Sequence, residues 1–240
     1  MKKIEREKMK KISLILVVIL ALAMALSACG LVSPKDLASP PSKDSTDITE
    51  DNVQTDKPGT RPIRGQWDGD TYTNTFLGLT FAKPSSWVAG NDAELQSELD
   101  FDGAGFSAPG EPFSDVMMEQ DVIFDMMATD PINFSSIIVN LENLKVTDIF
   151  NGATTDEAKY LEIVKPQLTA ALGVDTKFSE VTSVTIAGQE WKRMDASITF
   201  EGIDMTQSYV VRKVDNFMAI LMITQTPLSD TVDEMIAFFS

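Results

Sequence analysis

The stretch QEWKRMDASITFEGIDMTQSYVVRKVDNFMAILMITQT, residues 189–226, decides the fold. It divides into runs of β-branched and apolar residues, and the turn-forming segments Gly202–Asp204 and Asp215-Asn216 separate these runs. A fourth run, TKFSEVTSVTIA at residues 176–187, precedes them and ends at Ala187-Gly188. Short turns between successive runs of this kind predict an antiparallel meander.

Two patterns within this stretch predict how the strands are buried. The segment 194–200 places the apolar residues Met194, Ala196, Ile198 and Phe200 in alternation with polar ones, which predicts one buried and one wet face. The segment FMAILMI, residues 217–223, is apolar throughout. Such a strand is expected at the centre of a sheet that is covered on both faces.

The rest of the domain adds strands and helices in blocks. The other predicted elements are two strands, Gln120–Thr129 and Asn133–Leu144, and three helices, Asn91–Phe101, Thr154–Gly173 and Leu228–Phe239. Small polar residues at the two later helix starts predict N-caps at Thr154 or Thr155 and at Ser229 or Asp230. Pro166 should kink its helix. Strands followed by a helix, twice over and without βαβ alternation, predict an α+β fold with helices on both faces of the sheet.

A spaced motif opens the domain. It reads Y-x-N-x-x-x-G-L-x-F-x-x-P-x-x-W and consists of Tyr72, Asn74, Gly78, Leu79, Phe81, Pro84 and Trp87. It spans two further predicted strands, 72–76 and 79–82. We expect structural roles for its residues: Gly78 permits the bend, Pro84 ends the second strand, and Trp87 fills the core.

This motif resembles the opening of a group of Gram-positive bacterial lipoproteins of uncharacterised function that carry a PsbP/Mog1-like domain. The resemblance covers about residues 67–240. It implies an α/β/α sandwich in which an antiparallel sheet of about six or seven strands lies between helices. It also implies a binding or assembly role on a larger complex. It supplies no catalytic residues.

The N-terminus predicts export and lipidation. MKKIEREKMKK is a basic region, and a 17-residue apolar run, ISLILVVILALAMALSA, follows it. Cys29, the single cysteine, comes directly after Ser27 and Ala28. The sequence LSAC resembles the bacterial lipobox. The resemblance implies a diacylglycerol on Cys29, cleavage before it, and anchoring at the outer face of the cytoplasmic membrane. A plain transmembrane anchor is the alternative, although the run is short for one.

The chain therefore divides into three parts. Residues 1–28 are the predicted signal peptide, 29–65 are the lipidated cysteine and a tether, and 66–240 are one folded domain. The segment 31–65 is rich in Ser, Thr, Pro and Asp and has no apolar periodicity, which predicts disorder.

Composition excludes several functions. Removing the six basic and two acidic residues of the first 28 leaves 14 basic and 34 acidic residues, a net charge of about −20. Nucleic-acid binding needs a basic footprint, so no nucleic-acid partner is expected. The chain has no histidine, which excludes Ser-His-Asp catalysis and the commonest zinc ligand. With Cys29 lipidated, no free thiol remains.

Three segments are candidates for chemistry, and each has an ordinary structural explanation. GFSAP, residues 105–109, departs from the nucleophile-elbow pattern around Ser107. DFDGAG offers Asp100 and Asp102 as a weak calcium site, and WDGD at 67–70 offers two more carboxylates, but a solvated loop is favoured for both. Scattered acidic pairs could hydrolyse glycosides, but the aromatic residues typical of sugar clefts are few. No cofactor is predicted.

Six methionines permit two interpretations. Core packing is favoured, and a soft binding groove is the alternative for Met117, Met118, Met126, Met127, Met218 and Met222.

The favoured function is a non-catalytic, lipid-anchored accessory lipoprotein that engages a protein partner at the cell surface. A solute-binding lipoprotein that serves a transporter is the first alternative, and an envelope hydrolase is the second.

Overall fold

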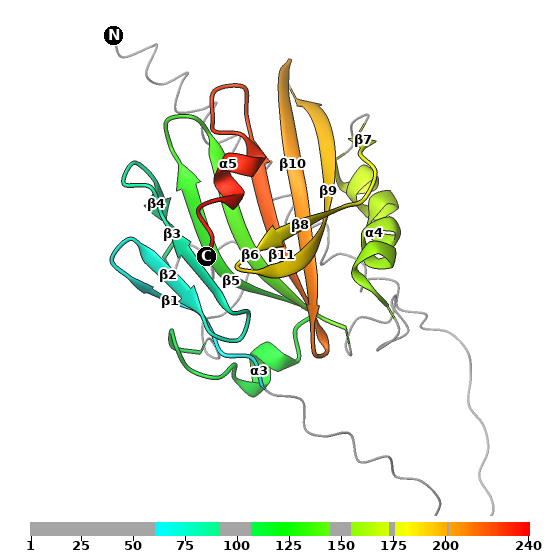
Figure 1. The fold of residues 1–240 in the computed structure, drawn as a ribbon. Coiled ribbons are helices and arrows are strands. Elements are labelled where there is room, and N and C mark those ends of the chain that lie inside the picture. Colours follow the sequence, from blue (N-terminus) through cyan, green and yellow to red (C-terminus); the bar gives the residue numbers. More distant parts are fainter. Residues whose placement is uncertain (1–60, 92–106, 145–154, 173–175, 201) are drawn as a thin grey trace, which may run out of the picture.

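The computed structural model describes residues 61–91, 107–144, 155–172, 176–200 and 202–240. A large antiparallel sheet lies at the centre, in the strand order β4-β5-β6-β11-β10-β9-β7, and β8 also pairs with β9 (Figure 1). Its strands are β4 Val88–Ala89, β5 Val122–Asp130, β6 Ser135–Asn143, β7 Lys177–Phe178, β8 Thr182–Ile186, β9 Gln189–Phe200, β10 Ile203–Val214 and β11 Phe217–Gln225. A separate three-stranded sheet contains β1 Gln66–Asp68, β2 Thr71–Asn74 and β3 Leu79–Ala82. The helices are α3 Asp115–Met118, α4 Glu157–Leu172 and α5 Val232–Ile236.

The predicted meander is confirmed. Strands β8 to β11 follow one another in antiparallel pairs, with Val210 opposite both Arg193 and Leu221. The tight turns use left-handed backbone at Ala187-Gly188 (φ 52° and 73°) and at Asp215 (φ 52°). Turns with this twist match the twist of the flanking strands and therefore keep the hairpins short.

The central strand is β11, as its apolar sequence predicts. It pairs with β6 on one side and β10 on the other, and its first eight residues are all buried. Alternate side chains of β11 enter two separate cores. Ala219, Leu221 and Ile223 pack with the three-stranded sheet and α5, whereas Met218, Ile220 and Met222 pack under α4.

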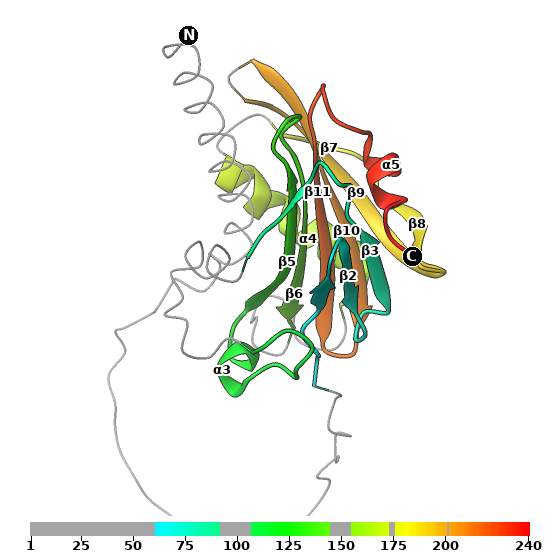
Figure 2. The same cartoon turned by 90° about the vertical axis from the view of Figure 1, so that its left-hand side faces the viewer.

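The domain therefore has three layers. In the view of Figure 2, α4 lies on one side of the large sheet, and α5 with β2 and β3 lies on the other. The α+β class with an antiparallel sheet is confirmed. The second face is covered mainly by the small sheet, with α5 beside it, where helices alone were expected. Counting the two-residue strands β4 and β7, the large sheet has eight strands.

The helices differ in detail from the sequence prediction. Helix α4 begins at Glu157, and Asp156 Oδ1 accepts a hydrogen bond from the Lys159 amide at 2.7 Å. Asp156, and not Thr155, therefore caps it. The helix continues through Pro166 without a break. Helix α5 spans five residues, and its N-cap is Thr231 and not Ser229 or Asp230. Thr231 is the N-cap because it forms a capping box with Glu234. The Thr231 hydroxyl accepts a hydrogen bond from the Glu234 amide, and the Glu234 carboxylate accepts one from the Thr231 amide.

The first strand of the opening motif ends earlier than predicted, at a side-chain hydrogen bond. Strand β2 stops at Asn74 and not at Phe76, because Asn74 Oδ1 accepts a hydrogen bond from the Leu77 amide at 2.7 Å and closes a turn. The predicted helix 91–101 lies outside the described residues except for Asn91. No helix among the residues in the described ranges is long and apolar enough to cross a membrane.

The methionines pack as core residues. Met117, Met126, Met218 and Met222 are buried, and Met118 and Met127 are partly buried against the two cores. These six side chains therefore offer no open methionine-lined groove.

Candidate functional site

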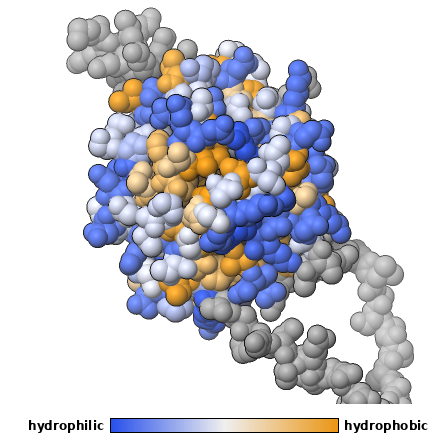
Figure 3. Space-filling model, viewed as in Figure 1, coloured by the Kyte–Doolittle hydropathy of each residue, from blue (hydrophilic) through white to orange (hydrophobic). Residues whose placement is uncertain are grey.

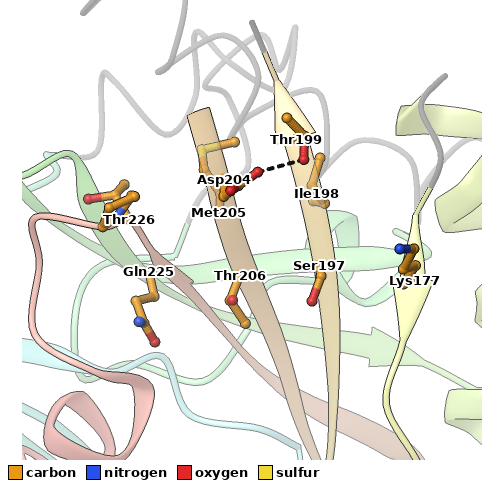
Figure 4. A pocket seen from close by; sticks show the side chains of 10 residues that line it. Lys177, Ser197, Ile198, Thr199, Asp204, Met205, Thr206, Gln225 and Thr226 are labelled. Carbon is orange, nitrogen blue, oxygen red and sulfur yellow. Dashed lines mark hydrogen bonds between the residues drawn. The ribbon is translucent and has the colours of Figure 1, made fainter. Parts of the chain in front are cut away.

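A pocket of about 450 Å³ lies at one end of the large sheet, and we name it the strand-end pocket (Figure 4). Its lining residues come from the β9–β10 hairpin, the start of β7 and the end of β11 with the loop that follows it. Its lining residues are Lys177, Ser197, Ile198, Thr199, Asp204, Met205, Thr206, Gln225, Thr226 and Pro227.

The strand register builds the polar floor of this pocket. Lys177 of β7 lies opposite Ser197 of β9, which lies opposite Thr206 of β10, which lies opposite Gln225 of β11. Residues directly opposite one another in antiparallel strands project to the same face. Four neighbouring strands therefore place an ammonium, two hydroxyls and an amide in one row.

The loop after β11 forms a fixed wall. Thr226 Oγ1 donates to the Asn133 carbonyl at 2.6 Å, and the Thr226 amide donates to Ser229 Oγ at 3.0 Å. Gln225 Oε1 accepts from the Val232 amide at 3.1 Å, so one half of its amide is committed to α5. These contacts hold the wall against the β5–β6 turn and against α5.

Two opposite charges stand in the pocket without ion-pair partners among the described residues: Lys177 and Asp204. Asp204 accepts one hydrogen bond, from Thr199 Oγ1 at 2.7 Å. The two residues lie on strands separated by β9, so their backbones are about 10 Å apart across the sheet. The pocket can therefore contact a cationic and an anionic group at separate points. The lining residues include no histidine and no cysteine.

A second polar constellation is buried under the three-stranded sheet, and we name it the Asp125 cluster. Asp125 is 4% exposed and accepts hydrogen bonds from the Tyr72 hydroxyl, from Asn74 Nδ2 at 2.6 Å and from the Gly65 amide at 3.0 Å. Burial raises the pKa of Asp125 above its ordinary value, and burial beside this carboxylate raises the pKa of Tyr72. Three donors on one buried carboxyl group favour its acceptor-only, ionised form.

This cluster joins the start of the domain to its core. Arg64 is 3% exposed and donates through Nη1 to the Ser107 carbonyl at 2.6 Å. The backbones of 62–64 and 110–113 exchange further hydrogen bonds. Residues 61–65 therefore pack onto the domain, although their composition suggested that they belong to the tether. A buried guanidinium explains the difference, because it needs fixed partners.

The predicted site residues fall in different places. Cys29, Asp100 and Asp102 lie outside the described residues. In the WDGD segment, Asp70 forms an ion pair with Lys83 Nζ at 2.8 Å. Across the described ranges, no three His, Cys, Asp or Glu side chains group as metal ligands do. Ser107 Oγ accepts from the Ser114 amide at 2.7 Å and is built into a turn.

The residues of the opening motif occupy structural positions. Tyr72 and Asn74 belong to the Asp125 cluster, and Trp87 is buried in the core beneath the three-stranded sheet. Gly78 has a φ of 63°, a left-handed conformation that favours glycine. Pro84 follows β3, and its carbonyl accepts from the Trp87 amide at 3.0 Å.

Sequence reasoning missed the strand-end pocket. The available signal was the alternation along β9 and β10, which places Ser197, Thr199 and Thr206 on a polar face. That pattern does not reveal that a loop from residues 226–227 forms a wall beside the face.

Comparison with known proteins does not assign the chain to a family. No protein-family model matches the chain, and no curated protein matches it. One similar solved structure is described as the crystal structure of LpqN, involved in cell envelope biogenesis, of Mycobacterium tuberculosis. It has 15% sequence identity and a TM-score of 0.34, and the match covers 67% of this chain and 76% of that chain. A likeness of this size is too weak to assign the chain to a fold family.

Proposed function

We propose that this chain is a lipid-anchored, extracytoplasmic accessory lipoprotein that binds a protein partner at the cell surface and catalyses no reaction. We further propose that its domain is of the PsbP/Mog1-like type found in Gram-positive lipoproteins. The observation that carries the proposal is the position of the only cysteine, directly after Ser27 and Ala28 at the end of the apolar run. Two acyl chains on Cys29 would hold the protein stably at a membrane.

The geometry of the described domain supports a binding role. Both faces of the large sheet are covered by packed cores. A partner would therefore bind at the ends, edges or loops of the domain. The strand-end pocket offers hydroxyls, an amide and the charges of Lys177 and Asp204, which suit contacts with polar groups. It lacks a histidine or thiol, and its one carboxylate accepts a hydrogen bond from a neighbouring threonine.

The first experiment tests the anchor. Cells expressing the tagged chain are labelled with a palmitate analogue, and the protein is partitioned between detergent and water phases. We expect label and detergent partitioning for the wild type and for the control Ser33→Ala, and neither for Cys29→Ala. Label on the Cys29→Ala protein would remove the anchoring part of the proposal.

The second experiment tests the binding role. In-cell crosslinking of the lipidated protein, followed by mass spectrometry, should enrich one defined protein that is lost in Cys29→Ala. Diffuse neighbours in both samples would contradict a specific partner.

A solute-binding role is the second candidate, because Lys177 and Asp204 have no ion-pair partner among the described residues and lie in a pocket of small-molecule size. Calorimetric titration of amino acids, short peptides and sugars separates the two. Saturable binding that Asp204→Asn abolishes, without a protein partner, would favour the solute-binding role.

A further inference from the structure

Exposed large hydrophobic residues gather at one end of the domain. The described residues include five of them: Val88, Val116, Ile132, Ile203 and Leu228. Four lie at the end that carries the strand-end pocket, at the β5–β6 turn, the start of β10, the loop before α5 and strand β4 (Figure 1). Ile132 and Leu228 are 68% and 70% exposed. We name Val88, Ile132, Ile203 and Leu228 the loop-end surface.

Single exposed apolar side chains are ordinary, but a cluster of them indicates an interaction site. In the space-filling view, hydrophobic side chains stand at the upper margin of the molecule, where the β5–β6 and β11–α5 loops lie (Figure 3). Thr226 Oγ1 donates to the Asn133 carbonyl at 2.6 Å, so these two loops are joined. The strand-end pocket lies between the β11–α5 loop and the start of β10.

The two most exposed side chains are held by hydrogen-bonded turns. Asp130 Oδ1 accepts from the amides of Ile132 at 2.9 Å and Asn133 at 3.2 Å, which fixes the β5–β6 turn. The Leu228 amide donates to Thr226 Oγ1 at 3.3 Å. Binding at preorganised side chains costs less ordering entropy than binding at mobile ones. The exposed positions of Ile132 and Leu228 are therefore suited to docking.

The direction of the surface argues for a protein and against the anchoring membrane. The chain enters the described domain at Arg61, beside α3, at the end opposite the loop-end surface (Figures 1 and 2). Strand β10, with 12 residues, separates the two ends by about 40 Å. The 31 residues between Cys29 and Arg61 would span about 30 Å as a coil. The predicted anchor therefore joins the domain at the end opposite the loop-end surface, so the attachment itself does not cover this surface.

Charge points to the chemistry of the occupant. Beyond residue 28 the chain carries a net charge of about −20, which repels anionic lipid headgroups and attracts basic proteins. In the adjoining strand-end pocket, Asp204, which follows Ile203 in β10, has no ion-pair partner among the described residues. A cationic side chain of a partner would supply one.

We propose that the loop-end surface docks a basic segment of an extracytoplasmic protein, with apolar side chains on Ile132 and Leu228 and a cationic side chain at Asp204. This inference rests on the proposed function, because it names where the partner binds and what its chemistry is.

Photo-crosslinking in cells tests the location. A photoreactive amino acid replaces Leu228, Ile132 or, as the matched control at the opposite end, Val116 in the full-length lipidated chain. We expect one protein, identified by mass spectrometry, to crosslink from Leu228 and Ile132 and not from Val116. Crosslinking of a partner from Val116 alone would overturn this inference and leave the proposed function standing.

Binding of the purified partner tests the chemistry. Ile132→Ser/Leu228→Ser in the mature protein should weaken its Kd by about tenfold, and Val116→Ser should leave it unchanged. Asp204→Asn should weaken binding and reduce its salt dependence, whereas Asp215→Asn, in the β10–β11 turn, should do neither. An unchanged Kd for the double variant would refute the proposal.

Two further outcomes would replace the protein by another occupant. The chain from residue 29, with Cys29→Ser, is mixed with phosphatidylglycerol vesicles and sedimented. Cosedimentation that Ile132→Ser/Leu228→Ser removes would assign the surface to lipid. Concentration-dependent dimerisation that the same variant abolishes would assign it to a second copy of this chain. Either result overturns the proposal.

Discussion

Removal of single hydroxyl groups from buried tyrosines tests how the Asp125 cluster stabilises the domain. Tyr72→Phe removes one of the three hydrogen bonds to the Asp125 carboxylate, and the ring stays in place. Tyr209→Phe is the matched control under α4. Its hydroxyl is equally buried but donates to a neutral group, Gln207 Oε1, at 2.5 Å.

The acceptor's charge sets the expected difference. A hydrogen bond to a charged group contributes about 1.5–3 kcal/mol, and one between neutral groups about 0.5–1.5 kcal/mol. We expect Tyr72→Phe to lower the free energy of unfolding by about 2 kcal/mol at pH 7 and Tyr209→Phe by about 1 kcal/mol. For a domain of this size these losses lower Tm by about 4–8 °C and 2–4 °C.

The effect of Tyr72→Phe should also depend on pH. Burial raises the pKa of Asp125, so the folded protein binds this proton more tightly than the unfolded chain and gains stability as the pH falls. The Tyr72 hydroxyl favours the ionised carboxylate, so its removal raises the pKa of Asp125 further. The penalty of Tyr72→Phe is therefore largest above the pKa of Asp125 and shrinks towards the ordinary carboxyl pKa.

Urea unfolding and thermal melts of both variants at several pH values measure these quantities. A Tyr209→Phe penalty equal to or above that of Tyr72→Phe would refute the charge argument. A Tyr72→Phe penalty that grows on acidification would refute the assignment of an ionised Asp125.

Three other substitutions test separate features by thermal melts. Gly65→Ala should unfold or strongly destabilise the domain, because an added Cβ would collide with the buried Tyr72 hydroxyl and ring; a Tm within 2 °C of wild type would contradict this packing. Thr231→Ala should cost about 1 kcal/mol by removing the hydroxyl half of the capping box. The Thr231 amide and hydroxyl both hold the pKa of Glu234 below its ordinary value, and NMR titration should show that pKa rise part of the way back, because alanine keeps the amide. Asn140→Leu should raise Tm, because both polar atoms of this fully buried amide lack a hydrogen-bond partner among the described residues and such burial costs about 1–3 kcal/mol; a lowered Tm would mean that the amide is satisfied in solution.

The sheet could be predicted well from the sequence because its turns and apolar runs are local sequence patterns. Gly188 and Asp215 have left-handed backbone in these turns, and glycine and aspartate are residue types that tolerate it. The apolar run of β11 predicted its central place, because burial on both faces demands it. These signals depend on residues that are neighbours along the chain.

Features that depend on distant contacts escaped prediction. Asp125 sits inside an apolar run of β5, and its partners Tyr72 and Gly65 are 53 and 60 residues away. Nothing near Arg64 in sequence indicates that the Ser107 carbonyl receives its guanidinium. The strand-end pocket is of the same kind, since its wall at Thr226 is fixed by the carbonyl of Asn133, 93 residues earlier.

Residues 61–65 form the junction between the predicted tether and the domain. Residues 61–65 are held by Arg64 and by the bond from the Gly65 amide to Asp125, and Asp125 lies in β5, the strand that leads into the Ile132 turn. One buried strand therefore connects the end that contains residues 61–65 to the proposed binding end. Releasing these five residues would lengthen the tether by up to about 17 Å.

The tyrosine variants consequently separate stability from presentation. If a fixed junction orients the surface, Tyr72→Phe should lower both the Tm and the crosslinking from Leu228 in cells. Tyr209→Phe, which acts under α4 and away from the junction, should lower only the Tm. Equal crosslinking by both variants, at temperatures where both are folded, would mean that the partner is reached without a fixed junction. In that case tether length alone, and not the Asp125 cluster, would govern access.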